Sequence, residues 1–575
     1  MKADLTRNTF DPLKHFTRVL MQQGRVQLDS DWNEQAAILW HYLQTLAADL
    51  IGPAGGPGGS GFSLDKLPIP GDFRIGLGRY YVGGILCEAD VESVAIIVPS
   101  TGSNDVQVDQ WTLDGKPFEP DQLVEVFDDV EQPFATPAFN PTVAQITNVN
   151  QANGKLTLKP VSAVDISKGI NPSLRRVITY LTQPDYPGAE KLTPITGNRA
   201  GYLVYLDVWE RHITFIEDDS IREVALGGPD TASRAKIVWQ VKIAKGLAQN
   251  TTKPCDNFNF DDKTFLSNLF GPNHGRLKAM AKQKATPANP CIIPPDANYH
   301  GPENQLYRVE IHKPGSAWTS SNASGPAPAP SSATDKAAKA NAATFKWSRE
   351  NGSVVFPIVG PISTADGTTT ITLANLGRDD RFGLAEGDWV EIQDDDYVLR
   401  NKAGNLLQVQ TIDRGALQIT LTGTADTGVG NDQSKHPLLR RWEQKQGDPA
   451  EGGLTLGADG AALIQESADM WLTLEDGVQI QFQPAAKGKT NQYRTGDYWL
   501  IPARTATADV EWPTETVKDN QGNTVTSPLA KPPQGIAHHY APLGVLTVGN
   551  NGEITIAGDT QNSCRKQFNL QAGHP

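Results

Sequence analysis

The chain is poor in cysteine, and its cysteines do not cluster. The four residues, Cys87, Cys255, Cys291 and Cys564, lie far apart without a C-x-x-C pair. A zinc or redox site needs closer ligand pairs, and a secreted disulfide scaffold needs a higher cysteine density. We therefore expect reduced, buried thiols. Cys255 and Cys291 both lie in proline-rich stretches, so a contact between them stays open.

Long apolar runs and excess positive charge are also missing. No stretch approaches the roughly 20 consecutive apolar residues of a spanning helix, and residues 1–10 lack the apolar run of a secretion signal. We expect synthesis in the cytoplasm without a signal peptide and no direct membrane span. The 51 Lys and Arg residues against 65 Asp and Glu give a net charge of −14, which repels phosphate backbones. Nucleic acid is therefore not an expected partner.

Glycine and proline are abundant, with 53 and 40 residues in a chain that is 38% hydrophobic. This mixture is typical of many short strands joined by tight turns. A chain of 575 residues exceeds one core and predicts two to four domains, at about one per 150 residues. We predict a mainly β fold of several β-sandwich or barrel-like modules, preceded by an amphipathic helix.

The first sixty residues differ from the rest. Asp31, with Glu34 three residues later, has the spacing of a capping box and predicts a helix start. An apolar stripe of about 18 residues follows at helical spacing, made of Leu39, Leu43, Leu46 and Leu50. Gly52-Pro53 predicts the helix end, and residues 52–61 (GPAGGPGGSG) predict a flexible tether. The stripe must be buried on the protein's own body or on a neighbouring subunit.

Strand and turn signals fill the remainder. Residues 202–216 and 237–243 predict long strands, and residues 79–86 predict two strands around a Gly-Gly turn. Hairpins are predicted at Asn351-Gly352, Asp476-Gly477 and Asn551-Gly552. The predicted division has five parts. Residues 1–62 are an N-terminal docking segment with helix and tether, residues 63–250 a β-rich domain, and residues 251–303 an irregular proline-rich connector or insertion. Residues 304–515 are a second β-rich domain with a mobile loop at 319–343, and residues 516–575 are a C-terminal hairpin region with a tail.

Motifs that carry chemistry are scarce. Gly488-Lys489-Thr490 ends like a phosphate-binding loop, but Gln483 stands where the first glycine belongs. The pair His538-His539 would point to opposite faces of a strand. Asp394-Asp395-Asp396 is the best cation candidate but lacks the spacing of a calcium loop, so a solvated turn is favoured and cation binding stays open. We predict no catalytic residues, no cofactor and no metal site.

Glycoside hydrolysis needs only two carboxylates across a cleft. Glu210, Glu350 and Glu511 are the candidates. The alternative, which we favour, pairs them with neighbouring arginines, namely Arg211, Arg349 and Arg504. Eight tryptophans are expected to anchor cores rather than form a sugar platform: Trp32, Trp209, Trp239, Trp347, Trp389, Trp442, Trp499 and Trp512.

Several long motifs are spread along the chain, at residues 19–35 (VLMQQGRVQLDSDWNEQ), 205–216, 224–231, 345–352 and 493–504. These motifs resemble an uncharacterised domain family found with phage-tail-like contractile injection systems, and residues 19–35 resemble its N-terminal signature. The resemblance covers nearly the whole chain. It implies a structural, non-enzymatic component of such a particle, baseplate-peripheral, connector or shell, released or membrane-associated with it. Its partners would be baseplate, sheath or tube proteins, with further copies of this chain in a symmetric assembly. The alternative is a tail-fibre-like protein that binds or cleaves glycans.

The N-terminal segment is the predicted assembly surface. A polar turn followed by an apolar helix makes a compact docking element, and repetition in a symmetric particle would add avidity. The alternative is that residues 1–50 cover the protein's own sheet. The predicted interface residues are Phe10, Phe16, Leu20, Gln23, Gly24, Arg25, Trp32, Leu39, Leu43 and Leu46.

Overall fold

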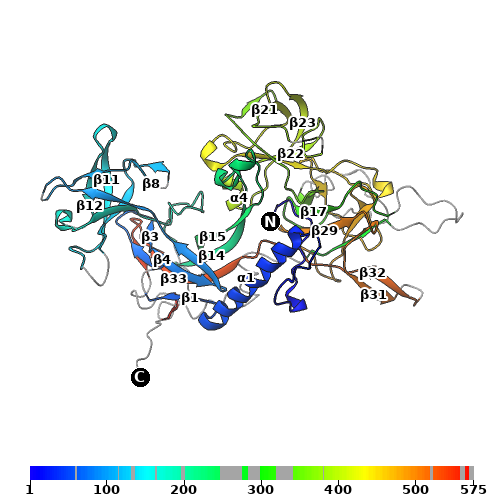
Figure 1. The fold of residues 1–575 in the computed structure, drawn as a ribbon, viewed down its shortest axis with the longest axis horizontal. Coiled ribbons are helices and arrows are strands. Elements are labelled where there is room, and N and C mark those ends of the chain that lie inside the picture. Colours follow the sequence, from blue (N-terminus) through cyan, green and yellow to red (C-terminus); the bar gives the residue numbers. More distant parts are fainter. Residues whose placement is uncertain are drawn as a thin grey trace. The chain divides into compact units, whose positions relative to one another are not determined.

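The backbone divides into two compact units. The first contains Met1–His41, Trp209–Ile237 and Leu266–Ala537, and the second contains Tyr42–Val208, Val238–Phe265 and His538–Pro575 (Figure 1). The structure, a computed structural model, describes all residues except the following: 59–60, 101, 114, 131–135, 162–164, 196–200, 246–274, 283–297, 319–340, 378, 380, 519–521, 557–563 and 569–575. The mainly β fold predicted from the sequence is confirmed. The predicted mobile loop at 319–343 lies almost wholly outside the described residues, as do Cys255 and Cys291.

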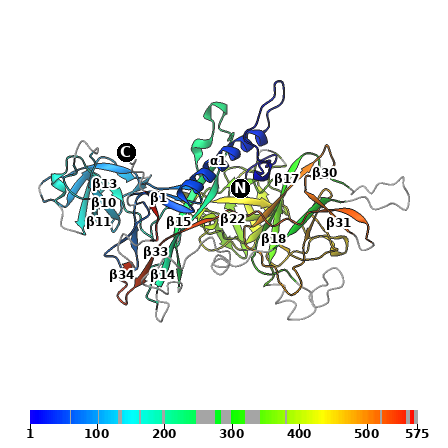
Figure 2. The same cartoon turned by 90° about the horizontal axis from the view of Figure 1, so that it is seen from below.

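A closed six-stranded antiparallel barrel lies in the second unit (Figures 1 and 2). Alternate apolar side chains point inward and form its core, for example Val124, Val126, Leu156 and Leu158. Closure leaves no free sheet edge. Around the barrel the strands are β10 (Leu123–Asp128), β11 (Thr142–Asn150), β12 (Lys155–Pro160), β7 (Asp105–Val108), β6 (Ser93–Ile97) and β13 (Pro172–Arg176).

Smaller sheets complete the second unit. The predicted hairpin at 79–86 is confirmed, with Gly83 and Gly84 at φ 56° and 78° between its strands. One sheet has the order β35 (Gln567–Phe568), β1 (Ala54–Pro57), β4 (Gly78–Val82), β5 (Ile85–Ala89). Two strand pairs are β2 (Leu64–Lys66) with β3 (Phe73–Ile75), and β8 (Thr112–Leu113) with β9 (Lys116–Pro117).

One four-stranded sheet contains strands whose residues belong to both units. Its order is β15 (Arg234–Lys245), β14 (Gly201–Ile213), β33 (His539–Val548), β34 (Ile554–Ile556). Strands β14 and β15 confirm the two long strands predicted from the sequence. The hairpin at Asn551-Gly552 is also confirmed, because β33 and β34 pair antiparallel.

The first unit is built from three larger sheets and the hairpin β31 (Thr514–Lys518)–β32 (Thr524–Pro528). A five-stranded sheet has the order β26 (Ala462–Leu463), β18 (Thr344–Ser348), β17 (Gln305–Ile311), β29 (Tyr498–Arg504), β30 (Asp509–Val510). It shares a core with the three-stranded sheet β16 (Leu277–Ala281), β28 (Val478–Phe482), β27 (Leu472–Thr473). The seven-stranded sheet has its own core and runs β19 (Val355–Pro357), β25 (Leu438–Trp442), β22 (Trp389–Gln393), β23 (Leu406–Asp413), β24 (Gln418–Thr422), β21 (Thr368–Thr372), β20 (Ser363–Ala365).

The two other predicted hairpins have different outcomes. Asp476-Gly477 joins the paired strands β27 and β28, as predicted. The hairpin at Asn351-Gly352 is wrong. The two residues do have positive φ, but β18 pairs with β17 and β26 while β19 pairs with β25. The turn therefore sends the chain from one sheet to another.

Helix α1 (Asp29–Ile51) begins two residues before the predicted start. The capping box is wrong, because Asp31 lies inside the helix and Glu34 accepts a hydrogen bond from Thr9 Oγ1 instead. Part of the predicted tether is a strand, since Ala54–Pro57 form β1. The shorter helices are α4 (Asp395–Leu399) and the 3-10 turns Pro12–Lys14, Gln151–Asn153, Ile166–Lys168, Asp219–Ile221, Val224–Leu226, Gln433–Lys435 and Pro449–Glu451.

Two cysteines are described. Cys87 is free and buried, as expected, and burial raises the pKa of its thiol. Cys564 is disulfide-bonded, so the expectation of reduced thiols is wrong for this residue.

Candidate interaction surface of the N-terminal segment

The first nine residues are held by the first unit. The Asn351 side-chain amide donates to the carbonyl of Ala3 at 2.8 Å, and an Arg504 guanidinium nitrogen donates to that of Thr6 at 3.1 Å. Lys2 Nζ lies 3.0 Å from a carboxylate oxygen of the buried Glu310. Residues 1–9 therefore pack on the protein's own sheets, as the alternative to docking on a neighbour predicted.

Lys2 joins a cluster of buried charges between the sheets. Glu310 on β17 also pairs with Arg308 and Lys346, and Lys346 Nζ lies 2.5 Å from Glu391 Oε2 on β22. Burial opposes the charge on Glu310, but its three cationic neighbours outweigh burial and hold its pKa below the usual range. Burial lowers the pKa of Lys2 to about 7, helped by nearby cations and opposed by Glu310. The charges lock the N-terminus to the strands.

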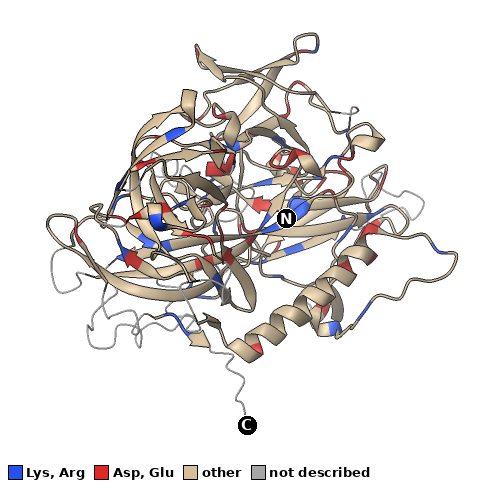
Figure 3. Ribbon diagram, turned by 60° about the vertical axis from the view of Figure 1, so that its left-hand side comes forward, with Lys and Arg blue, Asp and Glu red and all other residues tan. Residues whose placement is uncertain are grey.

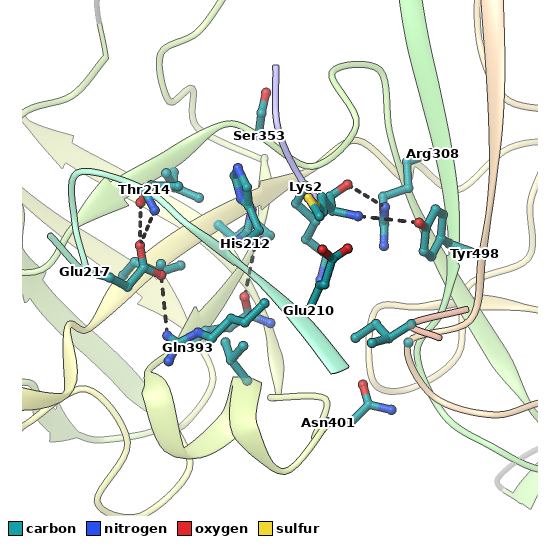
Figure 4. A pocket seen from close by; sticks show the side chains of 18 of the residues that line it. Lys2, Glu210, His212, Thr214, Glu217, Arg308, Ser353, Gln393, Asn401 and Tyr498 are labelled. Carbon is teal, nitrogen blue, oxygen red and sulfur yellow. Dashed lines mark hydrogen bonds and ion pairs between the residues drawn. The ribbon is translucent and has the colours of Figure 1, made fainter. Parts of the chain in front are cut away.

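A small cavity of about 110 Å³ lies beside this cluster (Figure 4). Lys2, Arg308 and Tyr498 line one side, and Glu210 and His212 project from β14. Burial raises the pKa of Glu210 and lowers that of His212 to about 3, so the imidazole is neutral. The volume suits a few water molecules and is below the several hundred Å³ of a ligand pocket.

The three carboxylates considered for glycan chemistry have different environments. Glu210 lines the cavity described above, and Arg211, its expected partner, pairs with Glu217 and Asp395. Glu511 pairs with Arg504, as the structural alternative predicted. Glu350 pairs with Arg381 rather than Arg349, whose partner is Glu475.

Of the eight tryptophans, six are buried and Trp389 is half-buried. Trp32 is 63% exposed, so its interpretation as a core anchor is wrong. It lies on the solvent-facing side of α1.

The acidic run at the start of α4 is occupied by groups of the protein itself. Asp394 caps α4 by accepting from the Tyr397 backbone N–H. Asp395 pairs with Arg211 and His436, and Asp396 pairs with Lys435. Across the described part of the chain, no group of three or more His, Cys, Asp or Glu side chains could hold a metal ion.

The arm before α1 and the outer face of α1 are exposed and apolar. In Figure 2 the dark-blue arm forms an open loop that extends beyond the start of the helix. Among the described residues, 23 large hydrophobic side chains are exposed, and thirteen of them lie within residues 13–50. Monomeric proteins rarely expose contiguous apolar patches above a few hundred Å². We call this surface the N-terminal apolar surface, formed by Leu13, Phe16, Leu20, Met21, Val26, Leu28, Trp32, Leu39, Trp40, Tyr42, Leu43, Leu46 and Leu50.

The inner face of α1 is held by its own chain. Ser30 and Ile38 are buried. Gln44 Nε2 donates to the Gly83 carbonyl at 3.0 Å, and a Cβ at Gly84 would lie 1.9 Å from the Gln44 carbonyl oxygen. The glycine turn between β4 and β5 therefore allows the helix to approach closely, and the helix has an attached face and an open face.

All but one of the predicted interface residues are exposed on this segment, and the exception is Phe10. Phe10 is half-buried, with its ring centroid 5.7 Å from that of His41. All the other predicted residues are exposed: Phe16, Leu20, Gln23, Gly24, Arg25, Trp32, Leu39, Leu43 and Leu46. Sequence reasoning omitted Leu13, Met21, Val26, Leu28, Trp40, Tyr42 and Leu50 from the interface, although Leu50 continues the helical spacing.

The fold and this surface define a two-unit, β-rich protein with an exposed apolar helix and arm at its N-terminus. The chain belongs to a family of unknown function, DUF6519, whose model matches residues 1–126, 176–257 and 270–570. No curated protein matches the chain, and no solved structure does. In the described parts of the chain, no helix is long and apolar enough to cross a membrane.

Proposed function

We propose that this protein is a structural component of a phage-tail-like contractile injection particle and assembles through its N-terminal apolar surface. The observation that carries the proposal is the concentration of exposed apolar side chains, with more than half of the described ones in residues 13–50. Burying each of these side chains in a partner would contribute roughly 1.5–3 kcal/mol before entropy costs. The link to this kind of particle comes from the family resemblance of the signature at residues 19–35.

The anchoring of residues 1–9 supports an assembly role. Lys2 and Ala3 fix the start of the segment, and Ser30 and Ile38 fix the helix. The arm between them is thus tethered at both ends, which lowers the ordering cost of docking on a neighbour. We place the protein at the periphery of the baseplate, or as a connector or shell part, with baseplate, sheath or tube proteins as partners.

The glycan-binding alternative has less support. A sugar platform needs several exposed aromatic side chains. Of the eight tryptophans expected to anchor cores, Trp32 alone is exposed. The other exposed large hydrophobic residues of α1 are four leucines and two aromatic residues, Trp40 and Tyr42.

The test is incorporation into purified particles. Deleting the N-terminus would also remove Lys2 and Ala3 from the first unit, so substitutions give a cleaner result. We expect mass spectrometry to detect the wild-type chain in particles, and the variant Leu20→Lys/Leu43→Lys to fall at least about tenfold in particles at equal cellular abundance. Leu226→Lys, at a leucine 66% exposed outside the segment, is the matched control and should be incorporated normally. Normal incorporation of the double variant would refute the proposal.

A further inference from the structure

The outer face of α1 has exposed apolar residues at the alternating three- and four-residue spacing of a coiled coil. Six apolar residues of this face are separated by four, three, four, three and four positions: Trp32, Ala36, Leu39, Leu43, Leu46 and Leu50. This is the two-per-heptad spacing of a coiled-coil seam. Trp40 and Tyr42, which are also exposed, occupy positions that flank the seam. All six residues are exposed, while Ile38 on the other side is buried. The seam therefore fits a second helix.

The seam is symmetric about residue 41. In an antiparallel pair of two such helices, Trp32 would face Leu50 of the second copy. Ala36 would face Leu46, and Leu39 would face Leu43. Every layer then combines two different positions, and the smallest side chain meets a leucine. A parallel pair would instead place Trp32 on Trp32 and Ala36 on Ala36, one layer overfilled and one underfilled.

Charge is compatible with the same arrangement. Helix α1 has four acidic residues and no Lys or Arg, as its red segments in Figure 3 show. Of the six positions that flank the seam, Asp49 alone is charged, and in the antiparallel register it faces the neutral Gln35. Antiparallel helices also oppose their macrodipoles favourably. A basic partner helix would instead be selected by several acidic residues along the flanks, whereas the flanks of α1 contain one, Asp49.

We propose that α1 pairs antiparallel with α1 of a second copy of this chain, forming a two-fold dimer. The exposed surface of the six side chains is roughly 600 Å² per copy, so the pair would bury roughly 1,200 Å², the lower end of the range for specific interfaces. Such a contact gives a modest affinity that repetition in a symmetric particle strengthens. The inference rests on the proposed function, because it assigns one occupant to part of the N-terminal apolar surface and leaves the arm for other particle proteins.

Sedimentation of the purified full chain tests the pairing. We expect a concentration-dependent monomer–dimer equilibrium, with a dissociation constant at least about 100-fold higher for Leu39→Lys/Leu43→Lys. Leu226→Lys should dimerise like the wild type. A wild-type chain that stays monomeric at about 100 μM, near the weak end of specific association, would overturn the proposal. So would a dimer that survives the double substitution.

Disulfide trapping tests the register. An oxidised mixture of Leu39→Cys and Leu43→Cys chains should form a cross-linked dimer, and neither variant should do so alone. The wild-type chain controls for its own cysteines. Cross-linking of each variant with itself would indicate a parallel pair and contradict the proposal.

Particle incorporation of the same double lysine variant separates this inference from the proposed function. If the wild-type chain is monomeric but the variant is excluded from particles, self-pairing is wrong and the assembly role stands. If the variant is monomeric yet incorporated normally, self-pairing stands and the seam has no role in assembly.

Discussion

Replacing Lys346 with methionine should strongly destabilise the first unit. Lys346 is 2% exposed and is the ion-pair partner of the fully buried Glu391 within the described residues. Glu391 otherwise accepts hydrogen bonds from Trp442 Nε1 at 3.0 Å and from the Gly404 backbone N–H at 2.8 Å. Those two neutral donors cannot compensate a buried negative charge.

The expected loss follows from this geometry. Removing one partner of a buried ion pair costs about 3–5 kcal/mol of unfolding free energy. Lys346 also lies 3.6 Å from Glu310, which keeps Lys2 and Arg308, so most of the loss comes from Glu391. The double variant Lys346→Met/Glu391→Gln removes both charges and should recover at least about 2 kcal/mol of the loss.

Guanidinium unfolding measures the global effect, and hydrogen exchange of peptides from β22 and β25 measures it within the first unit. Lys402→Met, at an exposed lysine, is the matched control and should stay within about 0.5 kcal/mol of the wild type. A loss below about 1 kcal/mol for Lys346→Met, unchanged by Glu391→Gln, would show that the buried charge of Glu391 does not depend on Lys346.

Three further predictions concern pH, backbone conformation and the two faces of α1. Burial lowers the pKa of the His312 imidazole from 6.5 to about 4, so the unfolded chain takes up this proton at a higher pH than the folded chain. The contribution of His312 to the free energy of unfolding is therefore complete above about pH 6.5 and falls by up to about 3 kcal/mol toward pH 4. His312→Gln should flatten that slope in unfolding titrations, and an unchanged slope would contradict the assignment. Gly477→Ala should lower the free energy of unfolding by more than about 2 kcal/mol, because the new Cβ would lie 2.0 Å from a carbonyl oxygen. Gly488 has a similar φ and open space around it, so Gly488→Ala should lower it by about 1 kcal/mol. Equal losses in thermal unfolding would show that the close contact at Gly477 has no effect. Leu43 is 62% exposed, so Leu43→Lys should leave the free energy of unfolding within about 0.5 kcal/mol of the wild type. Ile38 is 1% exposed, so Ile38→Lys should lower it by at least about 3 kcal/mol. A large loss for Leu43→Lys would show that the outer face of α1 is covered within the protein.

Turns could be predicted from the sequence, but the pairing of strands far apart in the chain could not. The hairpin at Asp476-Gly477 was predictable because the turn and both strands lie within a dozen residues. Asn351-Gly352 carries the same turn signal, but its strands pair with segments far away in the chain. A turn motif fixes a change of direction, whereas pairing depends on the whole set of strands.

The charge cluster was not predictable for a similar reason. Every residue of β17 and β18 is buried, including Arg308, Glu310 and Lys346. Strand alternation would place such side chains in water. The partners that bury them come from the first three residues and from β22, and no local pattern connects these stretches.

The apolar surface was predictable in part. Leucine spacing identified α1 and its stripe, but spacing alone does not say whether a stripe faces the core or the solvent. Trp32 shows this, since a large aromatic side chain favours a core position and yet is exposed. The exposed arm before α1 has no periodicity, so several of its apolar residues were not predicted as interface residues.

Photo-cross-linking inside intact particles shows whether the N-terminal apolar surface contacts a neighbouring protein. A photoreactive amino acid is placed at position 43 in the N-terminal apolar surface, or at position 226 as the control. Position 43 should form adducts with a second copy of the chain or another particle protein, and position 226 should not. If intact particles contain the chain but yield no adduct from position 43, the N-terminal apolar surface is not an assembly surface.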